Sequence, residues 1–152
     1  MVLGAGAIGG TVGGLLATGG CATLLVARGA HGAALATDGL RLRTCSGDHL
    51  LRLPVADAPR AVSFQTGDVA IVATKLQDAA LALDDLLAAA GPHLPVLCAQ
   101  NGLEGERLAA ARFERVIGSV SWMPCDTDPT LSPRPARRPR TSGSPCSAVL
   151  SR

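Results

Sequence analysis

Aromatic side chains are almost absent from this chain of 152 residues. It has one Trp, two Phe and no Tyr, which together make up 2% of the residues. A chain of this length forms one domain with a substantial hydrophobic core. That core must therefore be built from Leu, Val, Ile and Ala.

The chain also has no cluster of cysteine or histidine residues. Its five cysteines form no CxxC, and their odd number and wide spacing predict neither a disulfide framework nor a zinc site. We therefore expect free thiols, a reducing compartment and no bound metal. Two of the five lie in apolar runs and are expected in the core, namely Cys21 and Cys98.

Charge of either sign is scarce at the start of the chain and nearly balanced overall. The formal net charge of +2 gives no reason to expect nucleic acid as a partner. The first 27 residues contain no charged side chain, yet they lack the basic start of a signal peptide, and eight glycines interrupt the apolar run. We therefore expect a cytoplasmic protein that does not contact membranes.

The sequence does contain a glycine motif of the form GxGxxG close to its start. We expect the first glycine to allow a tight turn after a strand, the second to let the backbone approach a pyrophosphate, and the third to let a helix pack closely on the sheet. The backbone amides at the start of that helix would then bind the anion. A glycine-rich turn without a ligand is the alternative. The motif consists of Gly4, Ala5, Gly6, Ala7, Ile8 and Gly9.

An arginine follows the second expected strand, nineteen residues after the last glycine of the motif. Dinucleotide-binding domains that prefer NAD usually carry an acidic residue here, whereas the planar fork of Arg28 can bind a 2′-phosphate through two hydrogen bonds. The sequence therefore favours NADP (NADPH) as the cofactor. A solvated arginine at the end of a strand is the alternative.

Strands and helices are expected to alternate as far as residue 122. A strand that is apolar on both faces, such as 68–74, is typical of a parallel sheet covered by helices. The alternation predicts an α/β fold with a doubly wound parallel sheet of the Rossmann type, forming a dinucleotide-binding domain over 1–122. The expected strands are 2–3, 22–27, 40–43, part of 49–55, 68–74, 94–98 and 115–120, and the expected helices are 7–18, 33–37, 77–90 and 104–111.

The composition changes abruptly after Trp122. Residues 124–152 hold six of the ten prolines and five arginines, with few large apolar groups. Such a segment cannot bury enough surface to offset the entropy lost on ordering. We therefore expect residues 123–152 to be a disordered tail, with a basic, proline-rich segment that binds a partner as the alternative.

Four motifs in order resemble the ketopantoate reductase (2-dehydropantoate 2-reductase) family: GAGAIGG at 4–10, Arg28, VATKLQ at 72–77 and QNGL at 100–103. The resemblance covers residues 1 to about 122. It implies hydride transfer from NADPH to the ketone of 2-dehydropantoate, which gives pantoate for the synthesis of pantothenate and coenzyme A. It also implies that the glycine loop and Arg28 bind NADPH.

The resemblance further implies that Lys75 and Asn101, at the ends of adjacent strands, lie near both the nicotinamide and the substrate as cofactor-binding and catalytic residues. Their chemistry suits this role, because an ammonium or an amide N–H can stabilise the negative charge that develops on a ketone oxygen. The substrate carboxylate also needs a cationic or hydrogen-bonding partner. The alternatives are a solvated lysine, the only one in the chain, and a plain Asn-Gly turn.

The sequence departs from the family in two ways. The resemblance implies a second, helical domain that supplies the main acid lysine, and further strands of the cofactor domain, but neither is recognisable here. We expect a sheet that is incomplete at its C-terminal end, in a truncated or frame-shifted chain read out of frame beyond about residue 123.

Three functions remain open on this hypothesis. The chain is an NADPH-dependent reductase of 2-dehydropantoate, or it is a non-catalytic NADP-binding module or inactive fragment, or it reduces another small 2-oxo acid. A homo-oligomer, or a partner chain that supplies the missing domain, would fit the first of these.

Overall fold

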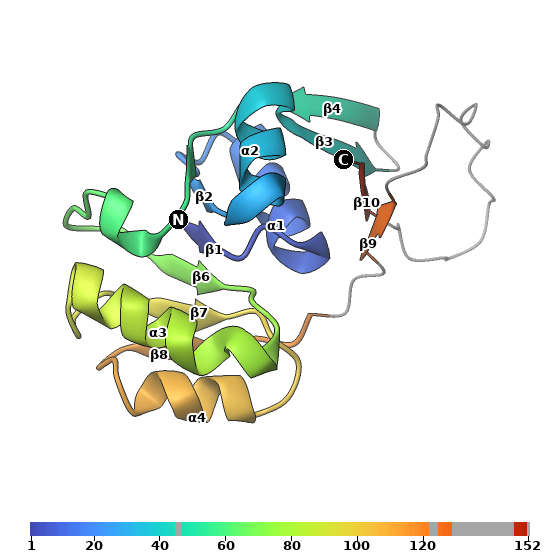
Figure 1. The fold of residues 1–152 in the computed structure, drawn as a ribbon. Coiled ribbons are helices and arrows are strands. Elements are labelled where there is room, and N and C mark those ends of the chain that lie inside the picture. Colours follow the sequence, from blue (N-terminus) through green and yellow to red (C-terminus); the bar gives the residue numbers. More distant parts are fainter. Residues whose placement is uncertain (45–46, 122–124, 129–147, 152) are drawn as a thin grey trace.

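The central element of the fold is a six-stranded parallel sheet (Figure 1). The computed structural model describes residues 1–44, 47–121, 125–128 and 148–151, and side chains are described up to residue 121. All five neighbouring pairs in the sheet run parallel, which confirms the predicted Rossmann-like α/β class. In spatial order the strands are β5 (Val55–Ala56), β2 (Leu25–Val26), β1 (Val2–Leu3), β6 (Ala70–Val72), β7 (Val96–Cys98) and β8 (Val116–Gly118).

Helices cover both faces of this sheet. Figure 1 shows α1 and α2 near β1 and β2, in the upper half of the view, and α3 and α4 near β7 and β8, in the lower half. Residues that alternate along one strand therefore enter different cores, with Val2 packed on the side of α2 and Leu3 on the side of α3 and α4. The helices are α1 (Ala7–Thr18), α2 (Gly29–Asp38), α3 (Leu76–Ala90) and α4 (Glu104–Ala110), and a short 3-10 helix, η1 (Pro59–Ala61), follows β5.

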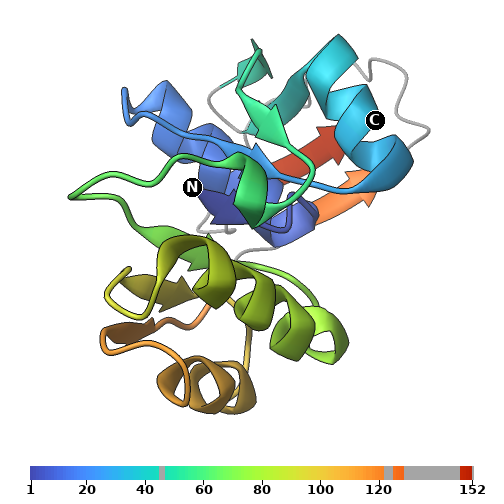
Figure 2. The same ribbon diagram turned by 60° about the vertical axis from the view of Figure 1, so that its left-hand side comes forward.

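A second, smaller sheet lies on the outer side of α1. Its strands are β4 (Gly47–Leu51), β3 (Leu40–Thr44), β10 (Ala148–Ser151) and β9 (Cys125–Asp128), in that spatial order. The strands β3 and β4 form an antiparallel hairpin, and β10 pairs antiparallel with β3 and parallel with β9. Figure 2 shows β9 and β10, in orange and red, beside α1.

The two strands β9 and β10 fall within the segment expected to be a disordered tail. At 125–128 and 148–151 the chain pairs with its neighbours instead, because pairing with β3 and between β9 and β10 satisfies its backbone hydrogen-bonding groups. The rest of the expected tail, at 123–124, 129–147 and 152, lies outside the described residues. Disorder there remains a prediction.

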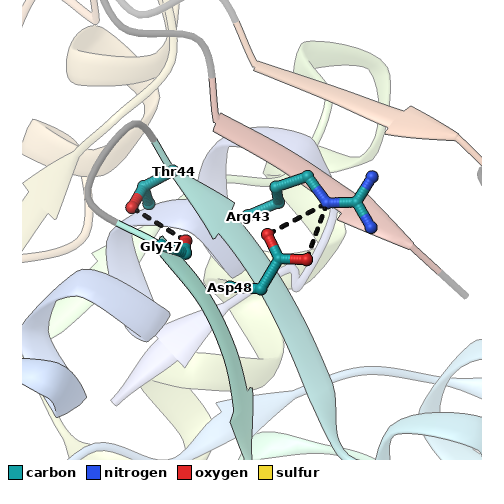
Figure 3. A network of polar contacts seen from close by, with 4 residues as sticks. All are labelled: Arg43, Thr44, Gly47 and Asp48. Atoms are coloured by element: carbon teal, nitrogen blue, oxygen red, sulfur yellow. Dashed lines mark hydrogen bonds and ion pairs between the residues drawn. The ribbon is translucent and has the colours of Figure 1, made fainter. Parts of the chain in front are cut away.

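The β3–β4 hairpin is fixed by polar contacts at its turn (Figure 3). The Nε of Arg43 donates to both carboxylate oxygens of Asp48, at 3.0 and 3.1 Å, and these two residues lie directly opposite each other in the ladder. Beside them the hydroxyl of Thr44 donates to the carbonyl oxygen of Gly47 at 3.1 Å. Opposite charges on facing positions favour this register over a shifted one.

The predicted helix at 7–18 agrees with the structure, and those at 77–90 and 104–111 agree to within a residue. The helix expected at 33–37 begins earlier, at Gly29, and the strand expected within 49–55 is divided between β4 and β5. The prediction for Cys98 is confirmed because it is buried, whereas that for Cys21 is wrong because it is exposed. Cys21 directly follows the turn after α1, four residues before the buried strand β2 begins, so its apolar run starts outside the core.

Candidate functional site

A cleft of about 380 Å³ opens at the carboxyl ends of the central strands. From β1 the chain moves to β2 and β5 on one side, and then returns to β6 on the other, so β1 and β6 flank a topological switch point. Ligands of open α/β sheets bind at this place. The walls of the cleft come from residues 3–6 after β1, 26–28 after β2, 57–59 after β5 and 73–75 after β6, with side chains of α2 and α3.

The glycine loop has the shape that close approach of a phosphate requires. Gly4 has a φ of +96°, in the left-handed region that favours glycine, and a Cβ there would lie 2.9 Å from the backbone nitrogen of Thr74. A Cβ at Gly6, by contrast, would meet no atom within 4 Å. The loop is therefore packed on its inner side and open on the side of the cleft.

The third glycine of the motif packs the helix against this loop. A Cβ on Gly9 would overlap the carbonyl oxygen of Gly4 and would lie 2.9 Å from the Cβ of Ala73. The helix α1 begins directly after Gly6, and no side chain among the described residues caps its start. The first backbone amides of α1 are thus left for a ligand or solvent, and the residues present fit a bound pyrophosphate.

Arg28 lies at the rim of the same cleft, as the N-cap of α2, and its side chain is exposed. It forms no ion pair with another residue of the described part of the chain. An unpaired guanidinium beside the open glycine loop can bind a second anionic group of one ligand.

A histidine that the sequence reasoning missed lies between these two groups. The Nε2 atom of His31, in the first turn of α2, is 2.7 Å from the carbonyl oxygen of Ala5 in the glycine loop. The side chain is half-buried and lines the cleft. Its spacing of three residues from Arg28, one helical turn, was the available signal, because such residues lie on the same face of a helix.

Lys75 follows β6 and is the N-cap of α3, with its side chain exposed at the cleft. The backbone beside it is held by Gln100, a buried residue after β7. The side-chain amide of Gln100 donates to the carbonyl oxygen of Thr74 at 2.7 Å, while its own oxygen is buried without a partner among the described residues. The loops after β6 and β7 are thereby joined.

Asn101 follows the adjacent strand β7, as expected, but it does not line the cleft. Its side-chain oxygen accepts a hydrogen bond from the backbone N–H of Ser121, at 3.2 Å. The amide group therefore keeps its two N–H donors for other partners. Of the predicted site residues, the cleft brings together Gly4, Ala5, Gly6, Arg28 and Lys75, while Ala7, Ile8 and Gly9 form the first turn of α1 behind it.

Three carboxylates were also missed by the sequence reasoning. Asp57, Asp78 and Asp85 line the cleft together with the two cations. Within the described ranges, no group of three or more His, Cys, Asp or Glu side chains has a geometry that could hold a metal ion. None of the described helices combines the length and hydrophobicity needed to cross a bilayer.

The fold and the switch-point cleft define a Rossmann-like α/β protein. The chain belongs to the family described as "Ketopantoate reductase PanE/ApbA", whose model matches residues 1–132. This is a family of NAD(P)H-dependent oxidoreductases that act on small molecules. The resemblance to ketopantoate reductases stated from the four motifs is thus confirmed.

Individual relatives are similar over the same region. A 2-dehydropantoate 2-reductase of Mesorhizobium japonicum is 35% identical, over 84% of this chain and 45% of its own length. The structure of a PanE/ApbA family ketopantoate reductase from Ralstonia eutropha has a TM-score of 0.72 at 32% identity, over 81% of this chain and 42% of that one.

A third similar structure is D-mandelate dehydrogenase, solved with NADH and anilino(oxo)acetate. It has a TM-score of 0.65 and 26% identity, over 76% of this chain and 39% of that one. The chain therefore spans less than half the length of each of these three relatives.

Proposed function

We propose that this chain is the cofactor-binding part of an NADPH-dependent reductase that converts 2-dehydropantoate to pantoate, a step of pantothenate biosynthesis. The observation that supports it most is the single cleft at the switch point, which the open glycine loop, Arg28 and Lys75 share. These groups suit, in that order, a pyrophosphate, a 2′-phosphate and the reacting end of the ligand. Family membership gives the reaction class.

Each proposed cofactor contact rests on a feature of the chain. The loop Gly4 to Gly9 would bind the pyrophosphate, because its open side and the uncapped start of α1 present backbone N–H groups. The guanidinium of Arg28 would bind the 2′-phosphate through charge-assisted hydrogen bonds. NADPH is therefore favoured over NADH.

When bound, NADPH supplies the hydride for reduction of the substrate ketone. The ammonium of Lys75 is positioned to stabilise the negative charge on the ketone oxygen, or to pair with the substrate carboxylate. Asn101 would contribute an N–H donor, since its oxygen is already held by Ser121. The Gln100 bond to Thr74 would keep the loops that carry these two side chains at a fixed separation.

A reductase of another small 2-oxo acid is the second candidate, favoured by the similarity to D-mandelate dehydrogenase in its complex with NADH and anilino(oxo)acetate. A non-catalytic NADP-binding module is the third, favoured because Asn101 does not line the cleft. Turnover of 2-dehydropantoate beside a panel of other 2-oxo acids would separate these three.

The remaining proposals concern organisation and setting. We place the dinucleotide-binding domain at 1–122, followed by a tail at 123–152. We also propose a cytoplasmic location, which the odd number and wide spacing of the cysteines favour, with no membrane partner, and no nucleic-acid partner, for which the net charge of +2 gives no reason.

The direct test is a titration of the purified chain with NADPH and with NADH, followed by calorimetric heat. Preferential binding of NADPH is the expected result. If a folded sample binds neither nucleotide, the proposed function is wrong. If it binds NADPH but turns over no 2-oxo acid, the binding module is the better description.

A further inference from the structure

We infer that His31 is a positioning residue that sets the preference for the 2′-phosphorylated cofactor by holding Arg28 against the glycine loop. This inference rests on the proposed function, since it concerns the same cleft. The hydrogen bond between His31 and Ala5 carries it, because that bond joins the two anion-binding parts of the site.

The chemistry of the bond fixes which ring nitrogen donates. A backbone carbonyl oxygen only accepts, so the Nε2 of His31, 2.7 Å from the oxygen of Ala5, must carry a proton. In the neutral ring the Nδ1 atom is then unprotonated, and it is buried with no partner among the described side chains and backbone. The ring thus commits its one donor to the glycine loop.

The bond is well placed to couple the two halves of the site. Ala5 lies between Gly4 and Gly6, and Arg28 is one helical turn before His31 as the N-cap of α2. Arg28, His31 and the loop all line one cleft. The start of α2 is therefore tied across the cleft to the backbone that would bind the pyrophosphate.

The other features at the start of α2 do not join this helix to the glycine loop. The N-cap makes no side-chain hydrogen bond, and Gly29, with a φ of +62°, has open space around it. A Cβ on Gly32 would meet the carbonyl oxygen of Ala27, so this close contact joins α2 to the segment that follows β2 and not to the glycine loop. Among the described residues, no other side chain of α2 forms a hydrogen bond to the glycine loop.

The two nucleotides should respond differently when this bond is lost. NADPH must engage the loop and Arg28 together, and a bidentate guanidinium contact depends on geometry. NADH has no 2′-phosphate and depends mainly on the loop. Loosening the first turn of α2 should therefore weaken NADPH binding more than NADH binding.

The test compares the ratio of the two dissociation constants, measured by calorimetry, among variants of the full chain. His31→Ala is expected to lower the preference for NADPH by about three- to tenfold, the value of one hydrogen bond. His31→Gln should keep the preference, because its side-chain N–H can donate from nearly the same place. In an Arg28→Ala background, His31→Ala should leave the ratio unchanged, because the contact that it positions is already gone.

Thermal unfolding identifies any variant that fails to fold, and His31→Asn, whose amide is too short to reach Ala5, then replaces His31→Ala. The inference is overturned if both nucleotides weaken by the same factor, or if the preference falls as far without Arg28 as with it. A folded wild-type chain that binds neither nucleotide overturns the proposed function as well. If the wild-type chain binds NADPH in preference to NADH but His31→Gln loses this preference as His31→Ala does, only the role given to His31 is overturned.

Discussion

Alanine substitutions at three glycines of one helix should separate cofactor binding from stability. At Gly6, the N-cap of α1, the φ of −73° suits any L residue, and an added Cβ meets no atom within 4 Å. Alanine there restricts the unfolded chain, which stabilises by about 0.4–1 kcal/mol, but it is a poorer N-cap by a similar amount. We therefore expect the free energy of unfolding to change by less than about 1 kcal/mol.

The same methyl group should strongly impair binding. It would project into the open side of the loop, where the proposed pyrophosphate contacts backbone N–H groups. Displacing one charge-assisted hydrogen bond costs about 1.5–3 kcal/mol, which is a rise of roughly ten- to a hundredfold in the dissociation constant for NADPH. Gly6→Ala should thus be a stable protein that binds the cofactor poorly.

Gly9→Ala should behave in the opposite way. Its Cβ would overlap the carbonyl oxygen of Gly4 and crowd Ala73. Overpacking of this kind costs about 1–3 kcal/mol, and the better helix propensity of alanine offsets only about 1 kcal/mol of it. The melting temperature should fall.

Gly19→Ala is the matched control at the other end of α1, because its Cβ would lie 3.4 Å from the nearest atoms, which is ordinary contact. Calorimetric titration with NADPH and thermal unfolding by circular dichroism measure the two effects. If Gly6→Ala binds NADPH as tightly as Gly19→Ala does, the pyrophosphate does not lie on this loop. The reasoning from added Cβ atoms is refuted if Gly6→Ala unfolds and Gly9→Ala does not.

Three further predictions concern single side chains. Arg28→Ala should weaken NADPH binding by about 1–3 kcal/mol and NADH binding far less, whereas the exposed Arg41→Ala should change neither; equal losses in a calorimetric titration would remove Arg28 from the 2′-phosphate. Thr11→Val should leave the free energy of unfolding unchanged or raise it by about 1–2 kcal/mol, because the buried hydroxyl has no partner among the described residues. A clear fall in this free energy, measured by urea unfolding, would show that the hydroxyl has a hydrogen-bond partner. The Arg112 guanidinium, 2.6 Å from Asp84, lowers the pKa of that carboxyl through a hydrogen bond. The pair therefore stabilises the fold at pH values above the ordinary Asp pKa, and this stabilisation is lost as the pH falls through the lowered pKa of Asp84. Asp84→Asn should therefore lower the melting temperature at neutral pH but not in strong acid, and an equal loss at both would exclude the ion pair as the cause.

Local signals in the sequence were sufficient to predict the parallel sheet and the core of the cleft. The run at 68–74 is apolar on both faces, and its strand β6 is indeed buried in the centre of the sheet. The spacing of Gly4, Gly6 and Gly9 predicts a turn, an open position and a close contact, and the structure has all three features. Such features depend on neighbouring residues, which is why they can be read directly.

Other features could not be read, because they depend on residues far apart in the chain. The pairing of β10 with β3 joins segments separated by about a hundred residues, and neither segment has a local sequence feature that indicates its pairing partner. The bond from His31 to Ala5 requires α2 to lie against the glycine loop, whereas the spacing of His31 from Arg28 indicates only that the two residues share one face of a helix. Asn101 follows the expected strand, but its position relative to the cleft depends on the loop after β7, where the backbone N–H of Ser121 donates a hydrogen bond to the side-chain oxygen of Asn101.

The glycines of α1 link the second sheet to the cofactor cleft. A Cβ on Gly13 would press against Leu25 of the main sheet, at 2.8 Å, and one on Gly14 would lie 3.0 Å from Leu42 of the second sheet. Each interior glycine costs a helix about 0.5–1 kcal/mol relative to alanine, so α1 depends on packing at both of these faces to be stable. Since α1 begins directly behind the glycine loop that lines the cleft, the strands that contact its outer face, β3 with β10 and β9, support the geometry of that loop.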